Sequence, residues 1–493
     1  MKYMLFDDRH LAQKNGFLRR VTSPGRASAI LIADQPWERG GLIGDPCMTV
    51  MRDDGVVKLW YSVASPDEKS GTSRQLSEAE KANLDLDDID PKFLADILCP
   101  QRYYLCYAYS TDGKNWIKPA LGICEVDGSR ENNIVFGGRL GCTVFIDPSA
   151  PGESRYKMIH GGSLKLPHWL NDKFIRMAYT GIYGAESADG IHWKSTDKPI
   201  MPHYTDTTNV CFYDDEQKKY IAFVRTDKNM VYDHGKTVMS DPDHRTYRII
   251  SRSASTDFFN FPAPIEILEP ETAEIQDYLS HWQHKEGMDF YNSAAMKYPY
   301  ADGVYFLFPS YFYHGSDEAV IHIATGRDSV NFTRHDEALI KPDDAPGFYA
   351  RQQYLACGMI PGENDSLTLY AHAVDTGHDA QAKNGKRKDA IIAYEFQTDG
   401  FIGQYADCGT LTTSALTVPP GAGKLKLRCR KNVGGKVDIE VFDQHKNLLA
   451  LNFTEYPAVN SGSVFTADLP ENITEATLKI SAGKSILFSI EII

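Results

Sequence analysis

The chain has 493 residues, of which 42% are hydrophobic and 24% are charged, and its formal net charge is −14 at pH 7. This composition is typical of a globular protein with a large core, and the negative charge makes nucleic acids unfavourable partners. The sequence contains no run of about 18 apolar residues, so no membrane partner is expected.

The first predicted elements, in chain order, are short strands rich in Val, Ile, Tyr and Phe, bounded by Gly, Pro, Asp and Asn. They cover residues 3–6, 48–51, 57–63, 103–109, 143–146, 156–159 and 174–180. A polar insertion, 66–100, separates two of these strands and contains a Ser-x-x-Glu pattern that predicts a helix at 76–82. We expect this insertion to form a pocket wall or a subunit contact in a homo-oligomer.

A turn motif recurs along the chain at intervals of about 70 residues. It reads Asp112-Gly113-Lys114-Asn115-Trp116 and Asp189-Gly190-Ile191-His192-Trp193, with degenerate copies at Asp257, Asp328 and Asp399. In each copy Asp is expected to accept backbone N–H bonds, Gly to take a positive φ, and the aromatic residue to pack on the sheet. Five such units of about four strands each predict an all-β fold with a five-bladed β-propeller.

The five units divide the first part of the chain into blades at 41–120, 121–200, 201–268, 285–340 and 348–405, with a connector at 269–284. An N-terminal strand is expected to complete the last blade. Beyond residue 408 the turns stop and strands of period two appear at 424–429, 437–441, 476–480 and 486–490. We therefore predict two domains, a propeller at 1–407 and a β-sandwich at 408–493. This second domain contains no Trp and one Tyr, Tyr456, which favours a structural clamp over a sugar-binding module.

The candidate catalytic residues stand where the first strand of a blade begins, because these strand starts converge on the central channel of a propeller. Asp45, Asp206 and Asp289 occupy this position in blades one, three and four. Carboxylates that converge in a cleft, one protonated and one ionised, are what glycoside hydrolysis requires. The alternative reading is that Asp stands at these strand starts because it favours turns.

Further polar residues near these strand starts are candidates for binding a substrate: Asn209, Tyr291, Asn292, Arg351 and Gln352. Four histidines on second strands or the loops after them are expected at the rim: His160, His314, His372 and His378. No histidine pair has the spacing of metal ligands, so neither a metal nor a cofactor is expected. Asp147 and Asp214 lie in hairpins between strands and are predicted to be a turn residue and a solvated residue, respectively.

These features resemble the five-bladed propeller glycoside hydrolases, both the invertase group of family 32 and the arabinofuranosidase and xylosidase group of family 43. The similarity rests on Asp45-Pro46, on the repeated turns, on the hairpin from Asp147-Pro148 to Arg155-Tyr156-Lys157, and on Asp399-Gly400-Phe401. It implies a nucleophile or base at Asp45. Asp206 stands where the invertases have the Glu-Cys acid, and blade two lacks their Arg-Asp-Pro.

The leading hypothesis is a glycoside hydrolase that removes a terminal sugar from an oligosaccharide. Its rival is a carbohydrate-binding propeller without catalysis, which the missing acid of blade two favours. The start of the chain lacks the apolar centre of a signal peptide, and the nine cysteines are scattered like free thiols. We therefore expect a cytoplasmic protein, or an exported one whose signal peptide is absent from this sequence.

Overall fold

The computed structural model describes residues 1–64, 103–137, 141–163, 180–201, 207–228, 230–233, 236–239, 247–271, 274–275, 287–378 and 387–493. For residues 45–47, 162–163, 180, 230–233 and 236–239 only the backbone is described. Apart from two helical residues at 274–275 and single turns of 3-10 helix such as Pro36–Glu38, the regular structure of these ranges is strand, so the predicted all-β class is confirmed there. None of their helices is long and apolar enough to span a membrane. The insertion 66–100 and most of the connector 269–284 lie outside the described residues.

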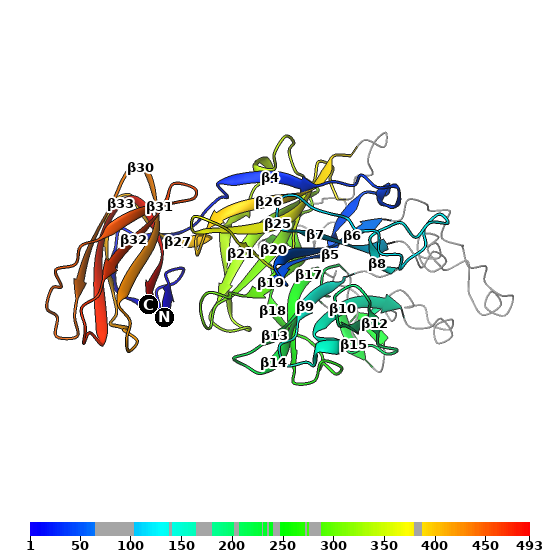
Figure 1. Cartoon of the computed structure of the whole chain (residues 1–493), viewed down its shortest axis with the longest axis horizontal. Helices are drawn as coiled ribbons and strands as arrows, with labels where there is room; N and C mark the ends of the chain where they lie inside the picture. The colour runs from blue at the N-terminus through cyan, green and yellow to red at the C-terminus, as the bar shows by residue number, and fades with distance from the viewer. Residues whose placement is uncertain are drawn as a thin grey trace.

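Five consecutive groups of four antiparallel strands, which we call blades 1 to 5, make up most of the molecule (Figure 1). Blade 1 consists of β5 (Leu42–Asp53), β6 (Val56–Ala64), β7 (Tyr103–Ser110) and β8 (Ile134–Gly137). Blade 2 consists of β9 (Thr143–Ile146), β10 (Tyr156–Ser163), β11 (Thr180–Ser187) and β12 (Lys194–Ser195). Blade 3 consists of β13 (Val210–Asp214), β14 (Lys219–Asp227), β17 (Arg248–Ser255) and β18 (Ile265–Leu268).

Blade 4 consists of β19 (Met288–Lys297), β20 (Tyr305–Tyr313), β21 (Glu318–Gly326) and β22 (Phe332–Ile340). Blade 5 combines β23 (Gln352–Leu355), β25 (Ser366–Val374) and β26 (Asp389–Gln397) with the N-terminal strand β4 (Arg26–Leu31), which pairs with β26. Three short strands accompany the blades: β15 (Met230–Asp233), β16 (Lys236–Met239) and β24 (Ile360–Pro361). The first strands of the blades contact one another in the order β5, β9, β13, β19, β23 and back to β5, so they form a closed ring.

In blades 1 to 4 the turn motif connects the third and fourth strands, which moves the end of blade 1 from the predicted residue 120 to Gly137. Within the turn, Oδ1 of Asp112 accepts the backbone N–H groups of Lys114 and Asn115 at 2.8 Å, and Gly113 has a φ of 73°, as predicted. The turn also bonds to the neighbouring blade, because Tyr370 of blade 5 donates to the carbonyl of Gly113 at 3.1 Å. Trp60 of blade 1 donates in the same way to the carbonyl of Gly190 in blade 2 at 2.7 Å.

A second contact repeats between blades, from a tyrosine on a second strand to an aspartate in the hairpin of the preceding blade. Tyr220 donates to Oδ2 of Asp147 at 2.7 Å, Tyr305 donates to Asp214, and Tyr156 donates to Asp53. Burial raises the pKa of Tyr220 to about 12, and the bond to Asp147 adds to this, so the phenol keeps its proton. The prediction that Asp214 is solvated is wrong: its side chain is fully buried, because Tyr305 of the next blade covers it.

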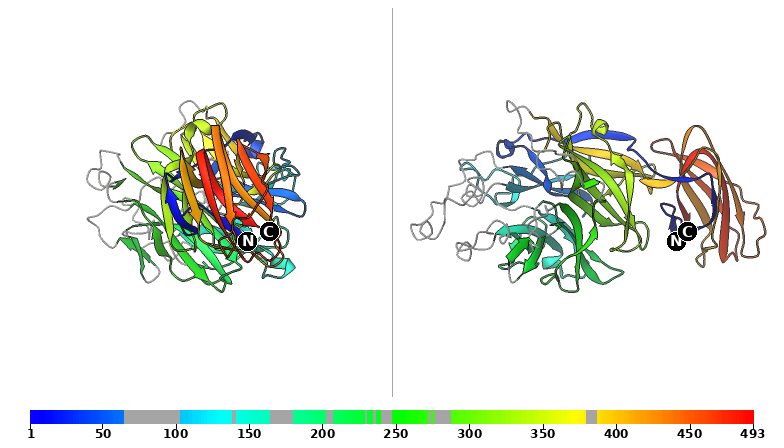
Figure 2. Two further views of the ribbon diagram at one scale, coloured as in Figure 1. Left: turned by 90° about the vertical axis from the view of Figure 1, so that its left-hand side faces the viewer. Right: turned by 180° about the vertical axis from the view of Figure 1, so that it is seen from behind.

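The C-terminal residues form one continuous sheet that also takes up the N-terminus of the chain. Its strands are β27 (Ile402–Ala406), β28 (Gly409–Thr413), β29 (Leu416–Thr417), β30 (Lys424–Phe442), β31 (Thr454–Ala458), β32 (Gly462–Asp468) and β33 (Glu475–Ile492). The N-terminal strands β1 (Lys2–Met4), β2 (Leu11–Asn15) and β3 (Leu18–Val21) pair with β33, β28 and β27. The two termini therefore lie side by side in this sheet, at the opposite end of the molecule from the outer edge of blade 2 (Figures 1 and 2).

The predicted strands 424–429 and 437–441 are parts of a single strand, β30, whose pairing with β33 shifts register between Lys431 and Lys436. Gly434 and Gly435 lie within the shifted stretch of β30. The strands predicted at 476–480 and 486–490 are likewise joined in β33.

A buried ionic cluster joins the C-terminal sheet to the blades. Asp399, the aspartate of the fifth turn copy, lies 3.0 Å from Nζ of Lys2 and 3.4 Å from Nη1 of Arg428. Tyr298 of blade 4 and Ser489 of β33 donate to the same carboxylate. The last turn copy therefore serves as the docking point of the second sheet.

Candidate functional site

Asp289, the second residue of β19, has a buried carboxylate in contact with the side chains of Arg248 and His314. Nη1 of Arg248 lies 3.1 Å from its Oδ1, and the backbone N–H of Arg248 donates to Oδ2 at 3.1 Å. Nε2 of His314 lies 3.4 Å from Oδ1. Burial raises the pKa of Asp289, but the charge of Arg248 and the bond to His314 more than offset it, so this pKa is lowered and the carboxylate is ionised.

Aromatic rings enclose this ion pair. The guanidinium of Arg248 lies 4.9 Å from the ring centre of Tyr291 and 5.1 Å from that of Phe312. Arg225 lies 5.2 Å from the same Tyr291 ring and donates to the Tyr291 carbonyl at 3.2 Å. Two arginines of blade 3 therefore stack on one tyrosine of blade 4, in the geometry of cation–π pairs.

The cluster continues into blade 5 through Tyr291, whose ring centre lies 4.4 Å from that of His378 and 5.5 Å from that of Tyr354. Tyr354 donates to Oε1 of Gln352 at 3.0 Å, and Nδ1 of His378 lies 3.2 Å from the Tyr354 hydroxyl. Of the residues predicted from sequence, the structure thus brings together Asp289, Tyr291, Gln352 and two of the histidines.

Asn209 and Asn292 lie at the adjoining strand starts, and both are buried. Asn292 donates from Nδ2 to Oγ1 of Thr208 at 3.4 Å, which links blades 4 and 3. Thr143 donates from Oγ1 to the carbonyl of Asn209 at 2.6 Å, which links blades 2 and 3. The starts of these three first strands are therefore fixed relative to one another.

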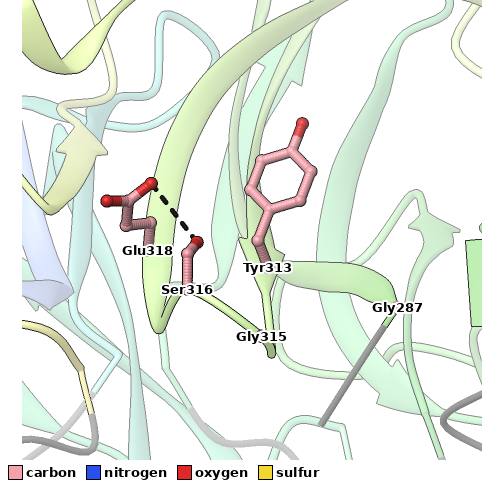
Figure 3. A pocket seen from close by; sticks show the side chains of 5 residues that line it. All are labelled: Gly287, Tyr313, Gly315, Ser316 and Glu318. Carbon is pink, nitrogen blue, oxygen red and sulfur yellow. Dashed lines mark hydrogen bonds between the residues drawn. The ribbon is translucent and has the colours of Figure 1, made fainter.

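Arg351 does not join the Asp289 cluster. Its Nη2 donates to the carbonyl of Ser316 at 2.7 Å and lies 3.7 Å from Oε1 of Glu318. Ser316 and Glu318 line an open pocket of about 470 Å³ together with Gly287, Tyr313 and Gly315 (Figure 3). The pocket borders the cluster, because the backbone N–H of His314 donates to the Gly287 carbonyl at 3.0 Å.

The side chains of the other two predicted catalytic residues are not described by the structure. Asp45 lies in β5 directly after Gly44, where only the backbone is described. Asp206 lies outside the described residues, directly before Thr207, which has a φ of 63°.

The prediction that the four histidines form a rim is wrong for His160 and His372, which are buried. Both stand on second strands, β10 and β25, whose faces pack against neighbouring blades. His314 and His378 do face the cluster. Sequence reasoning missed Arg225 and Arg248, which lie on strands β14 and β17 among apolar and small residues and belong to no local motif.

Comparison with solved structures finds proteins that resemble this chain in fold at low sequence identity. No protein-family model matches it, and no curated protein is similar in sequence. A family 43 arabinoxylan arabinofuranohydrolase from Bacillus subtilis, solved with cellotetraose, is 13% identical, with 94% of this chain and 98% of that chain covered and a TM-score of 0.41. A family 32 β-fructofuranosidase from Bombyx mori is 8% identical, with 99% of this chain and 95% of that chain covered and a TM-score of 0.40.

A family 62 hydrolase solved with xylotriose is 11% identical, with 76% of this chain and 98% of that chain covered and a TM-score of 0.43. The chain is thus similar in structure to five-bladed propeller glycoside hydrolases of families 43, 32 and 62. These structural matches include families 32 and 43, the two families that the turn motifs resemble.

Proposed function

We propose that the protein is a glycoside hydrolase that removes a terminal sugar from an oligosaccharide at the end of the ring where the first strands begin. Asp45 acts as nucleophile or general base, and Asp206 acts as general acid. Asp289 remains ionised and holds the side chains of Arg248 and His314 in place. The observation that supports this most strongly is the buried Asp289 carboxylate, which Arg248 and His314 hold ionised at the start of β19.

The proposal includes the architecture: a five-bladed propeller over residues 1–407 and an accessory β-sandwich over 408–493 that clamps it. The closed ring of contacts from β5 round to β23 supports the propeller. In such a ring the starts of the first strands converge, so residues far apart in the chain share one cavity.

The proposed reaction builds up positive charge on a sugar ring, and Asp289 supplies one negative charge beside Arg248. Glycosidic cleavage passes through an oxocarbenium-like state and needs one carboxylic acid and one carboxylate. Aromatic side chains such as Tyr291 and Phe312 exclude water and thereby strengthen electrostatic interactions with that state. Asp289 is not the proton donor in this proposal, because its lowered pKa keeps it ionised.

The alternative function is a carbohydrate-binding propeller without catalysis. It is favoured by the start of blade 2, where Gly141, Cys142 and Thr143 supply no carboxylate. It is also compatible with Asp289, whose carboxylate is already engaged by Arg248.

Kinetics on aryl glycosides and on plant or algal oligosaccharides distinguish the two functions. The wild type is expected to hydrolyse at least one of these compounds, and Asp45→Asn and Asp206→Asn are each expected to lose at least about 1,000-fold in kcat. Asp302→Asn, at an exposed turn of blade 4, is the matched control and should keep full activity. Full activity in both site variants would reject the catalytic assignment, whereas binding without turnover would favour the alternative.

A further inference from the structure

His372, on the second strand of blade 5, lies directly against the residue that precedes Asp45. A Cβ atom added to Gly44 would lie 2.3 Å from Cβ of His372 and 2.5 Å from its Nδ1, well inside van der Waals contact. The imidazole is 2% exposed. The ring of His372 therefore determines how closely the start of β5 approaches blade 5.

A second contact from blade 5 holds the same stretch of β5. Oδ2 of Asp389 accepts the backbone N–H of Leu42 at 3.1 Å and Nε of Arg387 at 3.0 Å. Arg387 also donates to the Leu42 carbonyl. Both backbone polar groups of Leu42 are thus bound by blade 5, three residues before Asp45.

The imidazole itself is polar and unpaired. Among the described residues, neither ring nitrogen of His372 has a hydrogen-bond partner, and Nε2 lies 3.9 Å from Oδ2 of Asp389, beyond hydrogen-bonding distance. A buried polar group without a partner costs free energy, and an apolar side chain of the same volume would avoid this cost. Natural proteins keep such an unpaired buried polar group most often at functional sites.

We propose that His372 is a positioning residue for Asp45. Its ring, packed between Gly44 and Asp389, fixes the backbone of β5 immediately before Asp45 and so sets where the carboxylate stands. The inference rests on the proposed function, in which Asp45 is the nucleophile or base. A reacting group that is misplaced by about 1 Å costs about 100-fold in rate.

Hydrogen–deuterium exchange tests the positioning without any substrate. His372→Ala is expected to raise the early deuterium uptake of the peptide covering residues 42–50 several-fold. His322→Ala, which empties a similarly buried histidine site in blade 4, is the matched control and should leave this peptide unchanged. Equal uptake of the peptide in the wild type and His372→Ala would overturn the proposal.

His372→Leu separates positioning from folding, because it keeps the volume and removes the unpaired nitrogens. It should melt no lower than the wild type and yet lose about 100-fold in kcat on a hydrolysed glycan, with little change in KM. Full kcat in His372→Leu would contradict the proposal.

The double variant with Asp45→Asn shows whether His372 acts through Asp45. The expected result is that His372→Leu causes no further loss in that background, whereas losses that add on a logarithmic scale would reject the coupling. If the wild type hydrolyses no glycan, the proposed function fails, and the exchange experiment still decides on His372.

Discussion

At the scale of single residues, the site depends on an ion pair that the fold has removed from water. The Asp289 carboxylate is buried, and the side chain of Arg248 is 25% exposed. Removal of one partner from such a pair leaves the other uncompensated, which typically costs about 3–5 kcal/mol. Because Arg248 belongs to blade 3 and Asp289 to blade 4, loss of this pair is expected to weaken both the packing of these blades and the site.

Asp289→Asn is expected to lower the free energy of unfolding at pH 7 by about 3 kcal/mol, because the partly buried charge of Arg248 then loses its carboxylate partner. Because the folded pKa of Asp289 is lowered, the carboxylate stabilises the fold above its unfolded pKa of about 3.9, and this contribution is lost as the pH falls through the folded value. Urea unfolding of the variant and of the exposed control Asp302→Asn at several pH values measures both effects. An unchanged stability would show that the pair contributes nothing.

Two histidines of blade 4, the buried His322 and the half-buried His335, give a second dependence on pH. Burial lowers the pKa of His322 and His335 to about 4, so both stay neutral in the fold but take up protons in the unfolded chain below about pH 6.5. Stability should therefore fall between pH 6.5 and 4, by at most about 1.4 kcal/mol per pH unit and histidine. His335→Asn should flatten this slope, and the exposed His445→Asn should leave it unchanged; equal slopes in both variants would contradict the assignment.

At the scale of elements, the turn motif does more than reverse the chain. Gly190 adopts a φ of 77°, and its carbonyl receives a hydrogen bond from Trp60 of the preceding blade. A Cβ atom at this position would lie 2.7 Å from Cζ2 of Trp60, whose ring is fully buried and cannot move aside. The glycine is therefore needed both for its backbone angle and for the contact between blades.

Gly190→Ala is expected to destabilise the protein by about 2–4 kcal/mol, because strain at positive φ adds to a clash in a packed core. Gly128→Ala is the matched control, since Gly128 has a φ of 76° and no atom within 4 Å of an added Cβ. The control should lose only about 1 kcal/mol. Thermal unfolding of both variants tests the difference. Equal losses of stability would mean that the clash with Trp60 adds nothing to the destabilisation.

The sequence predicted the positions of the strands and turns better than the contacts between blades. Strands such as 103–109 and 156–159 follow local composition, and the turn at Asp112 follows a local motif, so both could be located. The tyrosine and tryptophan that bond to these turns come from other blades, Tyr370 to Gly113 and Trp60 to Gly190, and no local pattern encodes such contacts.

The same limit applies to the site. Asp289 was found because it begins a strand, whereas Arg225 and Arg248 lie inside strands and acquire their role through the packing of blade 3 on blade 4. His372 was predicted to lie at the rim, because the sequence does not show which face of a strand is covered by another blade. The strands predicted separately at 424–429 and 437–441 are one strand, because the long pairing of β30 with β33 continues through a register shift.

At the scale of the whole molecule, the two halves of the chain share strands as well as surface. β1 and β3 pair with β33 and β27, and Tyr3, Leu5 and Phe17 belong to the core of the C-terminal sheet. Asp399 and Arg428 link that sheet to the blades through a buried ion pair. The C-terminal sheet therefore completes the packing of the N-terminal segment.

A chain that ends at residue 407 is expected to be insoluble or to melt markedly lower than the full chain. It would expose the apolar side chains of β1 and leave Lys2 and Asp399 without the neighbouring Arg428. Expression, size-exclusion chromatography and thermal unfolding measure this. A soluble 1–407 chain that melts like the full chain but loses polysaccharide binding would instead identify residues 408–493 as a sugar-binding module.

Proton nuclear magnetic resonance of the anomeric signals of plant and algal oligosaccharides, followed over time with the full chain, tests the proposed activity most directly. The account predicts that one terminal sugar is released from at least one oligosaccharide, with its anomeric signal appearing as the signal of the glycosidic bond declines. Asp45→Asn should abolish this release while the oligosaccharide still binds. An oligosaccharide that binds to the wild type and stays intact throughout would contradict hydrolysis and leave a carbohydrate-binding propeller.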